Sequence, residues 1–362
     1  MYNIYESIVS NFRLLFIYRD FFSVKKISKE FLNIIIGDSS FFPLTINMLI
    51  TDKCNFFCKM CTRKQDEDGG TELNVDDIQT FISQVKFHQP LIHIGGGEPF
   101  MRRDLLDIVS VIKRNQLKCL ITTNGFLMDE SDVDAMIELK VDVLIFSLYG
   151  WGDLHDEITG VKGSFDRTIK NLKSVLEKRT KHTKVFVSTL PLPENIVALK
   201  QLINNLQHLG VDGVKVENLN FLTVKEYNRS LSHKGCFNFS PSTFIRDVYF
   251  DREFIIELME LYKNIYKTYK DFVFIKPYLS KSQLINWYSM IPDRYVKCFF
   301  IAHSTFIKYN GDVIPCQFLA DCILGNIRDD SLKNIWSSRN YKKLRRTINK
   351  MKPVVCTRCC KN

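Results

Sequence analysis

Short runs of apolar and β-branched residues alternate with amphipathic stretches through the middle of the chain. Each run is five to seven residues long and is bounded by polar or turn-forming residues, as expected for strands. The stretches between the runs repeat apolar residues three and four positions apart, as one face of a helix does. The pattern predicts strands at residues 45–51, 91–95, 118–123, 142–148, 184–189 and 213–217, and helices at about residues 74–85, 102–115, 130–139, 165–178 and 195–209.

This alternation of strand and helix predicts an α/β fold. Six such units in succession imply a parallel sheet that is covered by helices. In sheets of this kind, ligands bind at the carboxyl ends of the strands. We therefore expect functional residues directly after the predicted strands, where Cys54 follows the first strand and the segment Gly95–Pro99 follows the second.

The composition is that of an ordinary folded protein. Its 362 residues are 45% hydrophobic, no apolar run approaches about 18 residues, and the first residues lack the pattern of a secretory signal. The eleven cysteines are therefore expected to be reduced thiols, metal ligands or catalytic groups of a cytoplasmic protein. The formal net charge is +10, and residues 331–362 account for it with ten Lys or Arg and no Asp or Glu.

Three cysteines lie together directly after the first predicted strand. Cys54, Cys58 and Cys61 form a C-x3-C-x2-C motif, so three thiolates on one short loop can surround a single metal centre. A structural zinc site usually has four protein ligands in paired C-x2-C units. Three ligands without a local fourth favour a [4Fe–4S] cluster with one open iron, to which a substrate or cofactor can bind, and zinc is the alternative.

This motif and the segments that follow it resemble the radical SAM superfamily. Cys54, Cys58 and Cys61 match the cluster motif of the family, and the glycine-rich segment after the second strand resembles its Gly-Gly-Glu-Pro sequence. The resemblance implies a partial (β/α)6 TIM-like barrel over residues 43–220, with S-adenosylmethionine bound to the open iron. It further implies cofactor contacts from Met60, which stands where an aromatic residue is usual, and from Gly95, Gly96, Gly97, Glu98, Asn124, Ser147, Ser188 and Val216.

The last 65 residues carry a second group of cysteines. Cys298 and Cys316 flank a predicted hairpin with a Tyr-Asn-Gly-Asp turn, and Cys356 and Cys359 form a C-x2-C motif near the end. This spacing resembles the twitch and SPASM cluster domains. The resemblance implies a small C-terminal α+β domain over residues 298–362, in which these four thiolates hold one auxiliary [4Fe–4S] cluster.

Two other cysteines of the tail have no assigned place in this arrangement. Cys322 and Cys360 either replace one of the four ligands, contribute to a partial second cluster, or remain free thiols. Because C-x2-C also occurs in zinc sites, a structural zinc is the alternative for the whole group.

The two remaining segments do not follow the alternating pattern. Residues 221–297 are rich in Phe and Tyr, hold one predicted helix at about 252–269, and are interpreted as a connector that covers the active site. Residues 1–42 form an amphipathic arm that we expect to pack on the barrel, with contact to a membrane surface as the lesser alternative. No base-reading motif accompanies the basic tail, so no nucleic-acid partner is expected.

The resemblance also implies an activity. Reductive cleavage of S-adenosylmethionine would produce a 5′-deoxyadenosyl radical that abstracts hydrogen from a substrate C–H bond, with an electron from a low-potential donor such as flavodoxin or ferredoxin. The expected substrate is a polar small molecule (a sugar, a cyclitol or a related biosynthetic intermediate) that is oxidised or rearranged. A ribosomally made peptide is the alternative substrate, and a non-catalytic iron–sulfur scaffold or electron carrier is the alternative class. Candidate acid–base or orienting groups are Tyr149, Glu217, Asn218 and His303.

Overall fold

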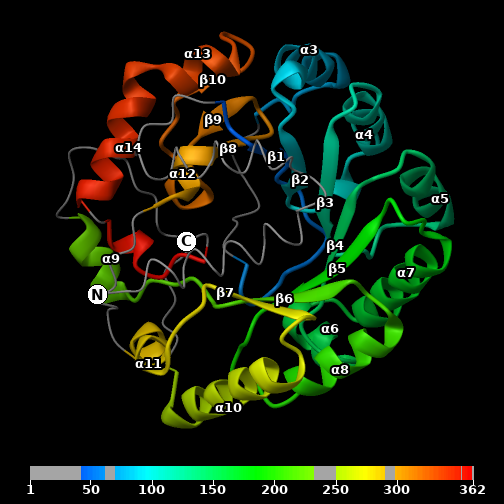
Figure 1. The fold of residues 1–362 in the computed structure, drawn as a ribbon, viewed down its shortest axis with the longest axis vertical. Coiled ribbons are helices and arrows are strands. Elements are labelled where there is room, and N and C mark those ends of the chain that lie inside the picture. The colour runs from blue at the N-terminus through cyan, green and yellow to red at the C-terminus, as the bar shows by residue number, and fades with distance from the viewer. Residues whose placement is uncertain (1–41, 62–69, 232–249, 290–297, 352, 361–362) are drawn as a thin grey trace.

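The computed structural model describes residues 42–61, 70–231, 250–289, 298–351 and 353–360. Within these residues, ten strands form one sheet in the order β10-β9-β8-β1-β2-β3-β4-β5-β6-β7. Strands β1 to β8 each pair in parallel with a neighbour, and the helices that connect the strands from β1 to β7 lie on the outer side of the curved sheet (Figure 1). The architecture is therefore a partial α/β barrel with a C-terminal domain, as the sequence predicts.

All six strands predicted for the barrel are present, and the sheet contains four more. Their bounds are β1 (Thr45–Thr51), β2 (Leu91–Gly96), β3 (Lys118–Thr123), β4 (Val143–Ser147), β5 (Lys184–Thr189), β6 (Gly213–Glu217), β7 (Val273–Lys276), β8 (Ser304–Ile307), β9 (Asp312–Ile314) and β10 (Gly325–Asn326). Strand β1 illustrates why these segments form strands. Its alternate residues Ile46, Met48 and Ile50 are at most 3% exposed, because they pack against the outer helices.

The helices follow the predicted positions in the barrel and continue into the connector and the tail. Their bounds are α3 (Val75–Val85), α4 (Leu105–Arg114), α5 (Glu130–Glu138), α6 (Asp153–Thr159), α7 (Ser164–Lys178), α8 (Leu199–Leu209), α9 (Val224–Leu231), α10 (Arg252–Thr268), α11 (Lys281–Ser289), α12 (Phe300–His303), α13 (Leu332–Ser337) and α14 (Arg339–Met351). Local capping sets several of these ends. Asn74 and Asp77 form a capping box at the start of α3, and Gly210 ends α8 with a φ of 81°.

The connector is more regular than the sequence predicts. Besides the predicted helix, α10, its described part contains α9, β7 and α11. Strand β7 is only four residues long and pairs in parallel with β6. Such a short apolar segment is defined by its neighbour in the sheet rather than by its own pattern.

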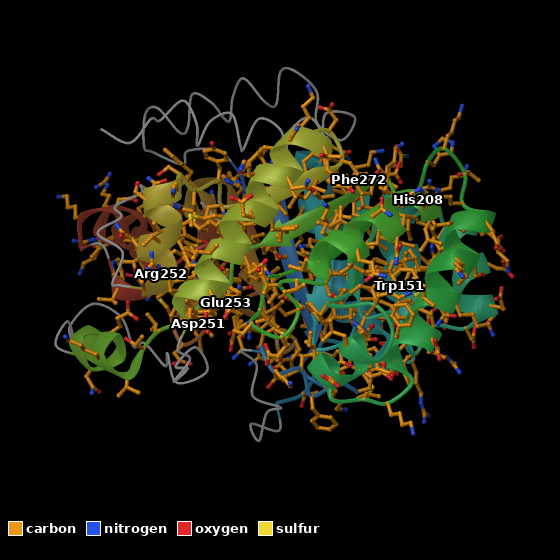
Figure 2. The ribbon with its side chains drawn as sticks, turned by 90° about the horizontal axis from the view of Figure 1, so that it is seen from below. Trp151, His208, Asp251, Arg252, Glu253 and Phe272 are labelled. Atoms are coloured by element: carbon orange, nitrogen blue, oxygen red, sulfur yellow. The ribbon has the colours of Figure 1, made fainter. Side chains whose placement is uncertain are left out.

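Helix α10 covers the side of the barrel next to β7. Figure 2 labels Asp251, Arg252 and Glu253 at its beginning, where the Asp251 carboxylate accepts a hydrogen bond of 2.7 Å from the Phe254 amide and caps the helix. Leu258 and Ile265 of this helix are at most 1% exposed against the core. Among the described helices, none combines the length and the apolar character that a membrane crossing requires.

The tail joins the barrel through the sheet. The predicted hairpin is present as β8 and β9, and β8 also pairs in parallel with β1, from Ser304 opposite Thr45 to Ile307 opposite Met48. This second pairing extends the barrel sheet and carries the tail cysteines to its edge. The sequence pattern alone does not reveal it, because the partner strands are more than 250 residues apart.

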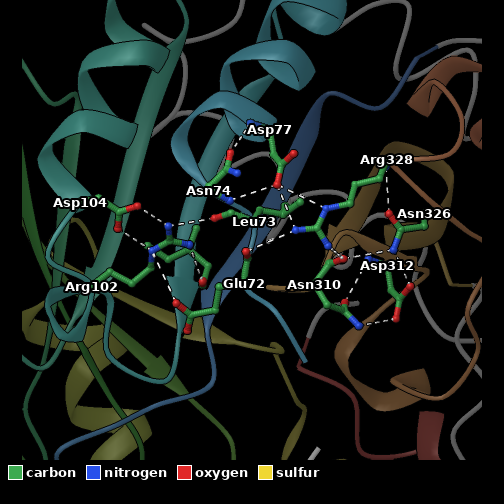
Figure 3. A network of polar contacts seen from close by, with 11 residues as sticks. Glu72, Leu73, Asn74, Asp77, Arg102, Asp104, Asn310, Asp312, Asn326 and Arg328 are labelled. Atoms are coloured by element: carbon green, nitrogen blue, oxygen red, sulfur yellow. Dashed lines mark hydrogen bonds and ion pairs between the residues drawn. The ribbon is translucent and has the colours of Figure 1, made fainter. Parts of the chain in front are cut away.

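A polar network fastens the same edge from outside (Figure 3). Arg328 pairs with Asp77 of α3 at 3.0 Å and donates hydrogen bonds to the carbonyl groups of Glu72 and Asn310. Arg102 donates to the carbonyl of Leu73 at 2.9 Å and to that of Ile50 in β1 at 3.0 Å. Barrel and tail are thus held together by contacts on both sides of the β1 end.

The barrel interior is apolar at one end and polar at the other. A small cluster of Leu91, Leu120, Val143, Ile145 and Phe186 fills the end at which the strands begin. Towards the carboxyl ends, the residues that share the inner face in register are polar: Ser147 is paired with Ser188, Ser188 with Lys215, and Glu217 with Lys276. The polar end is where the fold places a ligand.

Candidate active site

The cysteine loop after β1 is held in place by helix α6. The amide of Phe57 donates to the carbonyl of Thr159, and the amide of Lys59 donates to the carbonyl of Ile158, both at 2.9 Å. Side chains of Cys54, Cys58 and Cys61 are brought close enough to influence one another electrostatically. Burial raises the pKa of the Cys58 thiol to about 12, and the Cys61 and Cys54 thiols contribute to the rise. The three predicted ligands therefore share one small region.

The glycine-rich segment at the end of β2 lies directly against this loop. Gly97 donates from its amide to the carbonyl of Thr51 at 2.8 Å, and Glu98 donates to the carbonyl of Lys53 at the same distance. A Cβ atom at Gly97 would come within 2.0 Å of the Lys53 oxygen, so only glycine fits there. At Gly95, by contrast, no atom lies within 4 Å of the position of a Cβ, and the backbone faces open space.

The Glu98 side chain connects the glycine-rich segment after β2 with the end of β3. It is 1% exposed and accepts hydrogen bonds from the Thr123 hydroxyl at 2.6 Å and the Asn124 amide at 2.7 Å. Burial raises the pKa of Glu98 to about 7, although these hydrogen bonds oppose the rise. The Asn124 side chain in turn donates to Asn55 Oδ1 at 2.8 Å, within the cysteine loop.

The donor set fits a [4Fe–4S] cluster with an exchangeable corner and S-adenosylmethionine. Three thiols share the loop, the Gly95 backbone is open beside it, and the buried Asn55 Nδ2 has no hydrogen-bond partner among the described residues. Cysteine thiolates are the usual protein ligands of such a cluster. Open backbone and an unsatisfied amide next to the loop provide room and a donor for a polar cofactor.

Tyr149 reaches from the end of β4 towards the same loop. Its phenol interacts with Ser147 and lies within electrostatic reach of Cys58, Cys61 and Glu217, and burial raises its pKa. The backbone amide of Tyr149 donates to His155 Nδ1 at 3.1 Å, and the two rings stack at 6.0 Å between centroids. Tyr149 thus stands between the cysteine loop and the polar residues of β6.

Lys215 and Glu217 form an ion pair on the inner face of β6. Their charged atoms are 2.9 Å apart, and the side chains keep 24% and 22% exposure, so a small molecule can reach them. Burial favours the neutral amine, but the Glu217 carboxylate raises the pKa of Lys215 above its usual value. The Ser188 hydroxyl donates to Glu217 Oε2 at 3.4 Å.

The four predicted tail ligands also come together. Burial raises the pKa of Cys356 well above its usual value, and the neighbouring thiols that contribute are Cys298, Cys359 and Cys316. This set of four thiols fits a cluster without an open corner. Among the described residues, no three or more His, Cys, Asp or Glu side chains meet the geometry of a single-ion site.

Cys322 and Cys360 contact other groups. Cys322 is within electrostatic reach of the Tyr341 phenol. Cys360 is 3% exposed and exchanges two hydrogen bonds of 3.1 Å with the Asn220 side chain. Neither contributes to the electrostatic environment of Cys356. Their role as ligands stays a prediction.

Several predicted site residues have structural surroundings. Met60 and Val216 are 6% and 0% exposed within the main core, so their part in cofactor binding stays a prediction. Asn218 accepts hydrogen bonds from Tyr262 and Tyr288 at 2.8 and 3.0 Å and fastens β6 to the connector. His303 precedes β8, and burial together with the charge of Lys276 lowers its pKa to about 4.

Three residues near the site were not among the sequence predictions. Lys215 shares the inner face of β6 with Glu217, and this i, i+2 spacing of two charges within an apolar strand was a readable signal. Asn55 and His155 have no such signal, because their roles depend on loops that meet in space. Residues 1–41 of the predicted arm lie outside the described residues, as does the connector cysteine at position 236.

Comparison with known families identifies the class of protein. The radical SAM superfamily matches residues 48–206, and the SPASM iron–sulfur cluster-binding domain matches residues 298–360. The chain thus contains a radical SAM domain and a C-terminal SPASM domain. It is an enzyme whose cofactors are S-adenosylmethionine and [4Fe–4S] clusters.

Among curated proteins, the chain is similar to the tungsten-containing aldehyde ferredoxin oxidoreductase cofactor-modifying protein of Pyrococcus furiosus. The two are 25% identical over 333 residues, which cover 86% of this chain and 85% of the relative. Fe-coproporphyrin III synthase of Methanosarcina barkeri is 29% identical over 134 residues, 36% of this chain and 34% of the relative. The chain thus matches only about a third of the length of this second relative.

Among solved structures, the fold is similar to that of SuiB of Streptococcus suis bound to its precursor peptide SuiA. The TM-score is 0.64 at 18% identity, and the alignment covers 92% of this chain and 74% of SuiB. At this level of identity the comparison shows the shared fold.

Proposed function

We propose that this enzyme uses S-adenosylmethionine at the Cys54, Cys58 and Cys61 loop to abstract hydrogen from a polar small molecule and to oxidise or rearrange it. The observation that carries this proposal is the polar end of the barrel. The Lys215–Glu217 ion pair and Tyr149 lie on the side of the interior that faces the cysteine loop. A reachable ion pair suits a compact substrate with hydroxyl, carboxylate or amine groups.

The named relatives support a small molecule that serves as a cofactor or its precursor. One is described as modifying the cofactor of a tungsten enzyme, and the other as a synthase of Fe-coproporphyrin III. Both descriptions indicate biosynthetic intermediates. The narrower expectation of a sugar or cyclitol has no support from these relatives.

The chain's own residues hold and orient the reacting groups. When bound, the reduced cluster and S-adenosylmethionine together supply a 5′-deoxyadenosyl radical that removes a hydrogen atom from the substrate. The Gly95–Gly97 backbone would receive the cofactor's polar end, with Glu98 bracing that segment from below. Lys215 would hold an acceptor group of the substrate, and Glu217 Oε2 would accept a proton from a substrate hydroxyl held by Ser188.

The tail would hold one auxiliary [4Fe–4S] cluster through Cys298, Cys316, Cys356 and Cys359. Four thiols account for one complete cubane. An auxiliary cluster near the barrel could accept the second electron when the net reaction is an oxidation. The proposal also includes a low-potential flavodoxin or ferredoxin as electron donor and a cytoplasmic location, where thiols stay reduced.

A peptide is the second candidate substrate. The shared fold with SuiB, whose structure contains a precursor peptide, favours it, because the similarity extends over 92% of this chain. A peptide would have to reach the same Lys215–Glu217 pair. The two proposals therefore differ in the chemical class of the substrate. In both, hydrogen is abstracted at the same end of the barrel, next to the cysteine loop.

The test begins with the anaerobically purified full chain. Reduced with dithionite and given S-adenosylmethionine, it should release methionine and 5′-deoxyadenosine and contain about eight iron atoms. Cys58→Ala should contain about four and form no 5′-deoxyadenosine, whereas Cys119→Ala, a buried cysteine of β3, should retain both properties. A wild-type chain with full iron and no 5′-deoxyadenosine would support the non-catalytic scaffold or electron carrier instead.

A further inference from the structure

Helix α14 presents a row of positive charges to solvent. Its exposed residues include Arg339, Lys342, Lys343, Arg346 and Lys350, which we call the basic stripe. These positions are spaced by three, four or one residues, so they follow one face of the helix. Among the described residues, no carboxylate forms an ion pair with any of the five.

The opposite face of α14 is buried. Tyr341, Leu344 and Ile348 are at most 4% exposed. Arg345 also faces inward, where its guanidinium lies 3.8 Å from the ring centre of Trp336 and 4.0 Å from that of Tyr341. The inward face thus contains Tyr341, Leu344 and Ile348, and the outward face contains the basic stripe. Figure 1 shows α14 at the periphery of the molecule.

In the isolated protein, the basic stripe destabilises α14 electrostatically. Like charges three and four residues apart on a helix repel each other and destabilise it. No Asp or Glu occurs within residues 331–362, so the helix and its flanking residues contain no carboxylate that would reduce this repulsion. Negative charges on a partner would offset this repulsion, and their attraction to the basic stripe would stabilise the complex.

Helix α14 also contacts the tail cysteines. The amide of Cys298 donates to Asn349 Oδ1 of α14 at 2.8 Å. The Tyr341 phenol lies within electrostatic reach of Cys316. An α-helix with its side chains is about 10–12 Å across, so a partner on the basic stripe would be separated from the cysteine site by roughly one helix.

We propose that the basic stripe is the docking surface for an acidic one-electron carrier protein, of the flavodoxin or ferredoxin type, that exchanges electrons with the auxiliary site. This proposal rests on the auxiliary cluster included in the proposed function. In the exchange, one electron leaves the auxiliary site and reduces the flavin or iron–sulfur centre of the carrier, and no bond is formed or broken. The electron would enter the auxiliary site when the substrate is oxidised.

The details of the stripe favour a protein over a lipid surface or a nucleic acid. Binding in a membrane interface needs apolar side chains beside the charges, and Leu344 and Ile348 of α14 face the core instead. Recognition of a single-stranded nucleic acid uses exposed aromatic residues, and Tyr341, the aromatic residue of α14, is 0% exposed. A narrow row of charges suits a compact acidic patch on another protein.

The experiment compares two charge-reversal variants of the full chain. One carries Lys342→Glu, Lys343→Glu and Arg346→Glu, and the control carries Lys170→Glu, Lys173→Glu and Lys200→Glu at exposed positions of α7 and α8. Both change the net charge equally. Affinity for an acidic flavodoxin, for a plant-type ferredoxin, for anionic phosphatidylserine vesicles and for a DNA oligonucleotide is measured by calorimetry at about 50 and about 200 mM salt. Iron content and the cluster's visible spectrum are recorded in parallel.

The stripe variant should bind the carriers at least about tenfold more weakly than the wild type at low salt, and the control within about twofold. Wild-type affinity should fall with salt, and iron content should be equal in all three proteins. Equal carrier affinity in all three proteins, or binding only to anionic vesicles or to DNA, would overturn the docking proposal. A wild-type chain without iron in the tail would instead overturn the auxiliary cluster of the proposed function.

Discussion

Asn124 donates a hydrogen bond of 2.8 Å from its side-chain amide to Asn55 Oδ1, and so connects the end of β3 with the cysteine loop. Its backbone amide donates at 2.7 Å to Glu98 in the glycine-rich segment. One residue therefore joins the ends of the first three strands at the point where the predicted cluster ligands lie. This geometry makes Asn124 a positioning residue for the loop.

Replacing Asn124 by Ala should make the cysteine loop less rigidly positioned without removing any of the three cysteines. The substitution removes the bond to Asn55 and the bond that Asn124 Oδ1 accepts from the Phe126 amide, each worth about 1 kcal/mol, and leaves the Asn55 side chain less constrained. We expect iron to be lost several times faster from Asn124→Ala than from wild type when the anaerobic protein is incubated with a chelator. Asn204→Ala, at an exposed position of α8, should lose iron at the wild-type rate.

The buried carboxyl of Glu98 should make the stability of the metal-free protein depend on pH. Burial raises its pKa from 4.5 to about 7, so between these values the folded chain binds more protons than the unfolded chain. The stability that Glu98 contributes is complete below about pH 4.5 and is lost as the pH rises to about 7, a change of about 3 kcal/mol.

Urea unfolding of the metal-free wild type and of Glu98→Gln at a series of pH values checks this dependence. The difference in unfolding free energy between the two should change by about 3 kcal/mol between about pH 4.5 and pH 8 and should be constant above. Parallel pH profiles for the two proteins would show that Glu98 keeps an ordinary pKa in the folded chain.

Iron counting should separate the tail ligands from the other tail cysteines. Cys316→Ala removes one of the thiols around Cys356 and should lower the iron content of the anaerobic protein by about four atoms. Cys322→Ala should keep the full content, because Cys322 does not contribute to the environment of Cys356. An equal loss in both variants would make Cys322 a ligand.

Arg358 lies inside the C-x2-C motif and should anchor it. Its guanidinium pairs with the fully buried Glu226 of α9, donates to the Trp287 carbonyl at 2.5 Å and lies 4.2 Å from the ring centre of Phe221. Removing one partner leaves the other charge buried and unpaired, which costs about 3–5 kcal/mol. Arg358→Ala should lower the free energy of unfolding by that amount.

Lys178→Ala is the matched comparison for the Arg358 experiment. Lys178 pairs with Glu130 and Asp134 at 2.7 Å on the exposed surface of α7. Solvent screening should make the loss of this pair much smaller than the loss at Arg358. Denaturant unfolding of both variants measures the contrast, and similar effects would mean that the Arg358 pair does not anchor the motif.

The sequence alone determined the elements that depend on local pattern. The six barrel strands, the capping of α3 and the end of α8 follow from residues close together in the chain. The two cysteine groups are also local in their spacing, and both sets of predicted thiols come together in the structure. Spacing along a short loop or hairpin limits where its ligands can lie, so such motifs can be interpreted before any fold is known.

Only the tertiary structure decided the contacts between distant segments. The parallel pairing of β8 with β1, the bond from Asn124 to Asn55 and the approach of Tyr149 to Glu217 depend on how whole elements pack. The tertiary structure also decided which residues of each strand point into the barrel. In β6, Lys215 and Glu217 face the interior, whereas Val216 between them faces the helices. Side chains alternate with a period of two, so the orientation of each residue depends on the register that the neighbouring strands impose.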